Sequence, residues 1–242
     1  MALNPTMQIS PGTVFSPPST KKALARVALV DLKESARTVL SECFRQFGIE
    51  TVIMADQAAD RLKREKFEAC VVRLSPETEP VLDSARSSPS NNRMVIYGMG
   101  GTVQDAMKYS KYGINAVFNE PIERPSALKL VRATQMLVLH EFRRYVRIPV
   151  ITEVSLVAPD GRRFTASSQE ISTGGMSLRS GEDVSPGQAV EISFALLTLP
   201  RIWVRSTVSW RMPGNKTFGV RFDALDERRL RVKEWIDSYL DN

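Results

Sequence analysis

Short apolar runs alternate with amphipathic segments along residues 25–121, and this alternation restricts the fold more than any other feature of the chain. Right-handed strand–helix–strand connections place such strands in parallel, with helices on both faces of the sheet. We therefore predict a flavodoxin-like, doubly wound, five-stranded parallel sheet. The strand-like runs are "RVALVDL", "IETVIMA", "EACVVRL", "NRMVIYG" and "NAVFNEP". The helical segments are "KESARTVLSECFRQFG", "DQAADRLKREKF" with Asp56 as its N-cap, and "TVQDAMKYSKYG".

Beyond Arg147 the pattern changes to short alternating strands, with a hairpin signal at Asp160–Gly161. Six such strands within about seventy residues favour a small β-barrel. The chain then closes with the amphipathic helix "ALDERRLRVKEWIDSYL". The fold class predicted for the whole chain is thus α/β plus all-β. The residues expected on the buried face of the last helix are Leu225, Leu230, Val232, Trp235, Ile236 and Leu240.

The same patterns predict the domain boundaries. Residues 1–23 carry four prolines without any sustained period, which is typical of a flexible tail. Residues 24–124 form the first domain, 125–142 a linking helix and 143–242 the second domain. The side chains of the linking helix available for burial are Leu128, Val131, Met136, Leu137 and Leu139.

Composition limits the chemistry. Only one histidine, His140, is present, which argues against a histidine-based metal site or a Ser-His-Asp triad, and we expect neither a metal nor a cofactor. Cys43 and Cys70 lack paired spacing and are expected to be buried thiols. No run reaches the length of a membrane span, and residues 1–18 do not resemble a signal peptide. The simplest interpretation is a cytoplasmic protein without enzymatic activity.

The net charge of +6 is spread unevenly. Residues 1–26 hold three basic and no acidic side chains, whereas residues 141–242 hold 15 basic and 13 acidic ones. Neither predicted domain is strongly basic, which disfavours binding of duplex DNA through many phosphate contacts. A DNA-binding response regulator is also disfavoured because the second half lacks a helix-turn-helix pattern. Any anion site must be local.

The first domain resembles the receiver domain of bacterial response regulators. That family carries an acidic pair after the first strand, a phosphorylated Asp at the end of the third, a Ser or Thr after the fourth and Lys-Pro after the fifth. In this chain the four positions hold Asp31, Arg73, Gly98 and Glu120, and only Pro121 keeps the last motif. Arg73 can neither accept a phosphoryl group nor help to hold Mg²⁺. We predict a pseudo-receiver in which Arg73 pairs with Asp31 or Glu120, and which serves for docking a partner protein or for self-association.

The second domain resembles the PilZ family, whose members are receptors for cyclic di-GMP. The family's RxxxR motif is matched by Arg143 and Arg147 within "RRYVR". Its [D/N]xSxxG motif is matched by Ser172 and Gly175 within "EISTGG", with Glu170 at the place of Asp or Asn. Trp210 and the segment "GVRF" are also family-like. The resemblance implies a ligand site formed by Arg143, Arg144, Arg147, Glu170, Ser172, Gly174 and Gly175.

These residue types suit a cyclic dinucleotide. Arginine donates paired hydrogen bonds to phosphate or to the guanine O6/N7 edge and stacks on bases. In an extended segment Glu170 and Ser172 point to one side, toward a ligand, while Ile171 enters the core, and the two glycines let the backbone approach. Two alternatives stay open: the arginines could instead stabilise a helix C-terminus, and Glu170, one methylene longer than Asp, could mark a PilZ-fold adaptor that has lost nucleotide binding.

Overall fold

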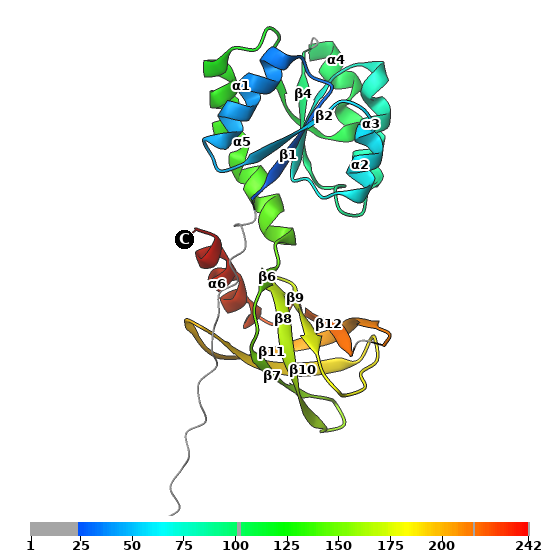
Figure 1. The fold of residues 1–242 in the computed structure, drawn as a ribbon, viewed down its shortest axis with the longest axis vertical. Helices are drawn as coiled ribbons and strands as arrows, with labels where there is room; N and C mark the ends of the chain where they lie inside the picture. Colours follow the sequence, from blue (N-terminus) through cyan, green and yellow to red (C-terminus); the bar gives the residue numbers. More distant parts are fainter. Residues whose placement is uncertain (1–23, 101–102, 215, 242) are drawn as a thin grey trace, which may run out of the picture. The chain divides into compact units, whose positions relative to one another are not determined.

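The computed structural model describes residues 24–100, 103–214 and 216–241, so the predicted tail, residues 1–23, lies outside the described residues. The described chain divides into two compact units (Figure 1). The first ends at Tyr145 and the second begins at Val146. Both units are built from the elements that the sequence pattern predicts, with differences that are given below.

The first unit is an α/β domain with one parallel sheet in the order β2-β1-β3-β4-β5. This is the strand order of the flavodoxin-like doubly wound fold, so the predicted architecture is confirmed. Its middle strands are buried on both faces, as their continuous apolar runs require. The strands are β1 (Arg26–Val30), β2 (Glu50–Met54), β3 (Ala69–Arg73), β4 (Val95–Met99) and β5 (Ile114–Phe118).

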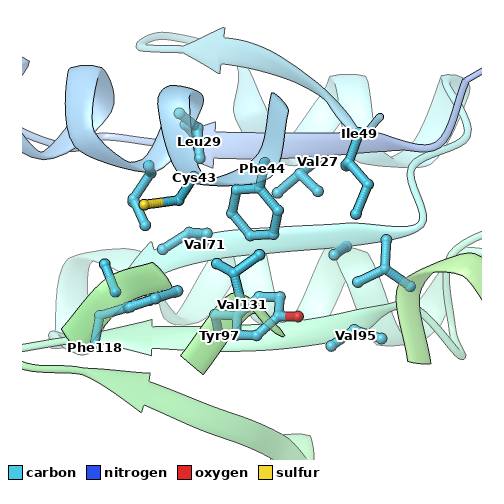
Figure 2. Packing of buried hydrophobic residues seen from close by; sticks show 14 of the residues in the cluster. Val27, Leu29, Cys43, Phe44, Ile49, Val71, Val95, Tyr97, Phe118 and Val131 are labelled. Carbon is cyan, nitrogen blue, oxygen red and sulfur yellow. The ribbon is translucent and has the colours of Figure 1, made fainter. Parts of the chain in front are cut away.

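Two cores lie on opposite faces of this sheet. The first is formed with α1 (Glu34–Arg45) and α5 (Arg124–Tyr145), and Figure 2 shows Phe44, Tyr97 and Val131 packed together in it. The Tyr97 hydroxyl donates to Thr134 Oγ1 at 2.8 Å, and burial raises the pKa of Tyr97 to about 12. The second core is formed with α2 (Ala58–Arg64) and α3 (Glu79–Ser87). Two short 3₁₀ turns, η1 (Pro76–Thr78) and η2 (Ser110–Tyr112), and α4 (Val103–Lys108) complete the unit.

Several local predictions for this unit are wrong. The sequence pattern did not indicate α3, because Pro80 and neighbouring serines mask its helical period. The N-cap of α2 is Gln57, in a left-handed conformation, and not Asp56. In α5, Met136 and Leu137 are exposed, whereas Val138 is buried. Val131 and Val138 are seven residues apart, so they lie on the same side of α5, and that side faces the core. Both cysteines are buried free thiols, as predicted.

The second unit is an antiparallel barrel. Six strands close into a ring because β9 pairs with both β12 and β8, and the short β6 adds to the end of β8. The six-stranded barrel with a C-terminal helix, α6 (Arg229–Asp241), is confirmed. Leu225 precedes α6 and is exposed, as is Leu230, so the prediction that both are buried is wrong. The strands are β6 (Ile148–Pro149), β7 (Glu153–Val157), β8 (Arg163–Ser172), β9 (Gly175–Arg179), β10 (Ala189–Leu196), β11 (Leu199–Met212) and β12 (Thr217–Phe222).

Candidate functional site

The short strand β6 brings the end of the arginine motif beside the second motif. Ile148 lies opposite Ile171 and Pro149 opposite Glu170, so Arg147 immediately precedes a strand paired with the motif segment of β8. The Arg147 Nε atom lies 3.8 Å from Glu170 Oε1, and the two side chains are 57% and 41% exposed. A solvent-exposed pair of this kind contributes only about 0–1 kcal/mol. Both charged groups are therefore accessible at little energetic cost.

A β-bulge precedes Glu170. The β8–β9 register shifts between Ser168 and Glu170, which leaves Gln169 as the additional residue. Ser168 is buried, donates from Oγ to the Val150 carbonyl at 2.5 Å and accepts from Thr152 N–H at 2.8 Å. The hydroxyl thus fixes the segment that follows β6 to the strand that carries Glu170.

Ser172 is the last residue of β8 and is engaged within the turn that follows it. Its side chain is buried, and its hydroxyl donates to the Gly175 carbonyl at 3.1 Å, within the turn between β8 and β9. The expected contact of Ser172 with a ligand stays a prediction. The hydroxyl stabilises the turn, and this intramolecular hydrogen bond occupies its donor.

The two glycines of the turn differ. A Cβ atom at Gly175 would lie 2.2 Å from the Val220 carbonyl oxygen, so close packing of β9 on β12 requires glycine there. A Cβ atom at Gly174 would meet nothing within 4 Å. The requirement for Gly175 comes from the barrel itself, whereas Gly174 faces open space.

Arg221 is a cation that the sequence analysis did not assign to the site. It lies opposite Gly175, which in turn lies opposite Ser172, and its side chain is exposed. The flanking Val220 and Phe222 are buried, so the alternation of "GVRF" directs Arg221 to the outer face. The alternation of apolar and charged residues in "GVRF" is the sequence feature that indicates an exposed Arg221.

The first two arginines of the motif lie in the last turn of α5, in the other unit. Arg143 is half-buried. Arg144 Nη1 lies 3.2 Å from Glu141 Oε2, and the buried Glu141 carboxylate also receives Lys66 at 3.1 Å. Arg144 therefore neutralises a buried carboxylate within its own unit, which differs from the ligand contact that the resemblance implies.

Two of the four positions compared with receivers, Arg73 and Glu120, form an ion pair at the carboxyl ends of the strands. Arg73 donates to both oxygens of Glu120, at 3.0 and 2.9 Å, which confirms one of the two predicted pairings. Gly100, which has a φ of 69° in the left-handed region that favours glycine, lies next to this carboxylate. Asp31, just after β1, is exposed and has a φ of 47°.

Gly98 does not follow the fourth strand, as predicted, but lies inside β4. A side chain there would meet Leu74 at 2.7 Å, which explains the glycine by packing. Within the described ranges, no group of three or more His, Cys, Asp or Glu side chains is arranged to hold a metal ion. No helix among the described residues is long and apolar enough to span a bilayer.

Comparison with known proteins agrees with this division of the chain. Residues 141–241 match the family model of the PilZ domain. The chain thus carries a PilZ domain, preceded by a domain with the doubly wound strand order of receivers. PilZ domains form a family of cyclic di-GMP receptors. A search of curated proteins gave no match.

Solved structures with a similar fold fall into two groups. The first group includes the PilZ domain of CeSA from a cellulose-synthesizing bacterium. It has 19% sequence identity and a TM-score of 0.33, and the match covers 39% of this chain and 97% of that one. The second group includes the chemotaxis protein CheY4 of Vibrio cholerae. It has 18% sequence identity and a TM-score of 0.41, and the match covers 46% of this chain and 98% of that one. The receiver domain of the sensor histidine kinase PA1611 from Pseudomonas aeruginosa has 20% identity, a TM-score of 0.40 and coverage of 48% and 98%.

Proposed function

We propose that the chain is a cyclic di-GMP receptor in bacterial second-messenger signalling, and that it works without catalytic turnover. The observation that carries this proposal is the pairing of β6 with β8, which sets Arg147 beside Glu170. Cyclic di-GMP offers two phosphates and two guanine edges. An arginine fork and a carboxylate are complementary to these groups.

In this proposal Arg143 and Arg147 bind phosphate or guanine, and Glu170 accepts from guanine N1–H and N2–H. Arg221, on the outer face opposite Gly175, adds a further cation. The exposed Arg147–Glu170 pair has to separate when the ligand binds, and its weakness in water makes that separation inexpensive. Ser172 and Gly175 act indirectly, by shaping the turn.

The receiver-like domain is the output part of the proposal. The Arg73–Glu120 pair occupies the strand ends where receivers are phosphorylated, so phosphorylation does not control this chain. Dinucleotide binding on the linker segment instead changes how the first domain docks a partner or self-associates.

Isothermal titration calorimetry of the full chain with cyclic di-GMP tests the proposal. Losing a hydrogen bond to a charged group costs about 1.5–3 kcal/mol, so Arg147→Ala is expected to weaken binding at least about tenfold. Arg163→Ala, at the far end of the same strand β8, is the matched control and is expected to change affinity less than about twofold. Absence of binding heat with the intact protein contradicts the proposal.

The adaptor alternative rests on Glu170. If the longer side chain prevents dinucleotide binding, the wild type gives no heat, and Glu170→Asp gains affinity by about 1–3 kcal/mol, the scale of one methylene in a fitted site. If the wild type binds, the same substitution measures how far the misfit weakens the receptor. The two outcomes separate an adaptor from a receptor.

A further inference from the structure

The β10–β11 hairpin leaves one strand edge open. β12 pairs with β11 only from Ser206 onward, where Ser206 lies opposite Phe222. On its other side β11 pairs with β10 as far as Leu199. The stretch 199–204 is thus paired on one side only among the strands described, and the hairpin reaches beyond its neighbours in Figure 1.

The direction of the open hydrogen-bonding groups follows from Arg205. Its carbonyl accepts from Asp223 N–H at 2.8 Å, and its N–H donates to the Asp226 carboxylate at 2.9 Å, both on the β12 side. Because alternate residues of an antiparallel strand face the same neighbour, the N–H and C=O of Trp203 also face that side. Within the described chain, neither group meets a partner there, and such an edge is a template for an added strand.

A groove of about 390 Å³ lies along this edge. One side is formed by Arg201, Ile202 and Trp203, a residue that is 42% exposed, and the other by residues just before α6 and in its first turn. Those residues are Glu227, Arg228 and Arg231. Three arginines against one glutamate make the groove cationic.

The three arginines of the groove differ in whether an acidic side chain of the same chain already pairs with them. Arg228 is held by Asp226 at 2.8 Å and by Glu191 at 3.3 Å. Arg201 donates to the hydroxyl of Ser193 at 3.2 Å, and neither it nor Arg231 has an ion pair with a described residue. Two uncompensated cations therefore flank an exposed indole and an open strand edge.

We propose that this groove docks an extended acidic segment of a partner protein, which adds to β11 as a further strand. Main-chain hydrogen bonds to Trp203 supply affinity, and alternate side chains supply specificity. Acidic side chains of the segment pair with Arg201 and Arg231, while apolar ones cover the indole. A second copy of the chain is a poorer occupant, because identical arginines would meet. Residues 1–23 contain no acidic side chain, so charge complementarity points to a different chain.

The test uses the full chain and a fluorescein-labelled peptide of alternating valine and aspartate, with binding followed by fluorescence anisotropy. Saturable binding is expected. Reversing one charge removes an attraction and adds a repulsion, so Arg231→Glu is expected to weaken binding about tenfold. Lys233→Glu makes the same charge change on α6 but outside the groove lining, and it is expected to have an effect of less than about twofold.

Peptides N-methylated at every second residue, in each of the two registers, separate strand addition from charge attraction. The register that blocks the pairing groups is expected to lose at least about tenfold in affinity, because several main-chain hydrogen bonds are removed. Equal binding of both methylated peptides, or of wild type and Arg231→Glu, overturns the proposal. It is also overturned if the peptide does not bind while phosphatidylglycerol vesicles bind in an Arg231-dependent way, because the groove then recognises an anionic surface.

Discussion

Single residues in the barrel motif divide into those that hold the fold and those left for a ligand. Gly175 and Ser172 belong to the first group, because a Cβ at Gly175 would clash with Val220 and the Ser172 hydroxyl closes the turn. Arg147 and Glu170 belong to the second, since both are exposed and only weakly paired. A short sequence motif of this type therefore mixes structural and binding constraints.

The two glycines of the turn give a direct comparison. Gly175→Ala is expected to lower the free energy of unfolding by about 2–3 kcal/mol, because the new methyl group forces β9 away from β12. Gly174→Ala meets open space and is expected to change it by less than about 0.5 kcal/mol. Urea unfolding of both variants measures the difference, and equal stabilities would show that the close approach to Val220 is not a constraint.

The sequence motifs identify which residues belong to the candidate sites, but they do not give the partners or the burial of the side chains. Arg73 ends β3 and Glu120 follows β5, the two strands on either side of β4, so their pairing follows from positions at the same carboxyl edge of the sheet. The placement of Glu170 depends on the bulge at Gln169, which no local pattern indicates, and the Ser172 hydroxyl is engaged within the turn that follows β8. The resemblance places Arg144 in the ligand site, whereas the ion pair of Arg144 with Glu141 depends on the burial of Glu141 by tertiary packing.

Among the elements, the buried strands were the easiest to predict. Their apolar runs are unambiguous, and the five-stranded order follows from chain connectivity. α3 was not predicted, because its propensity is low and its stability comes from burying Leu82 and Ala85 against the sheet. The short strand β6 has only two residues and could not be recognised, although it brings the two motifs together.

The ion pairs of Glu65 with Arg26 of β1 and Arg61 of α2 make the stability of the first domain depend on pH. Glu65, just after α2, lies 2.7 Å from Arg61 Nε and 3.2 Å from Arg26 Nη2 of β1. Hydrogen bonds from Arg61 and then Arg26 lower the pKa of Glu65 from 4.5 to about 2. Because the folded-state pKa is the lower one, the stabilisation is fully present above pH 4.5 and is lost as the pH falls toward 2.

Glu65→Gln is therefore expected to unfold at a lower urea concentration than wild type at pH 6, and this difference is expected to shrink at pH 3. Far-UV circular dichroism follows the helices of the first domain. Asp60→Asn on the same helix is the control, since Asp60 has no ion pair with a described residue. A difference between wild type and Glu65→Gln that stays constant from pH 6 to pH 3 would contradict the assignment.

At the scale of the whole molecule, the first domain has the doubly wound strand order of receivers, and an arginine lies at the end of its third strand. Phosphoryl transfer needs a carboxylate nucleophile and a Mg²⁺ held by carboxylates. The corresponding strand end holds Arg73, which is already bound to Glu120. We therefore predict that the first domain is not phosphorylated.

Incubation with acetyl phosphate and Mg²⁺, followed by intact-mass measurement, checks this prediction. The mass of the chain is expected to stay unchanged under conditions that phosphorylate a reference receiver domain. A stable increase of one phosphoryl group on a peptide from the first domain would show that phosphorylation is retained.

The central claim is that cyclic di-GMP binds where β6 pairs with β8. Hydrogen–deuterium exchange of the full chain, with and without saturating cyclic di-GMP, tests it most directly, because it locates the site as well as detecting binding. The account predicts slower exchange in residues 146–150 and 169–175, and a smaller change for Arg147→Ala at the same concentration. Unchanged exchange in both segments of the wild type, at a dinucleotide concentration that gives full binding heat, would contradict it.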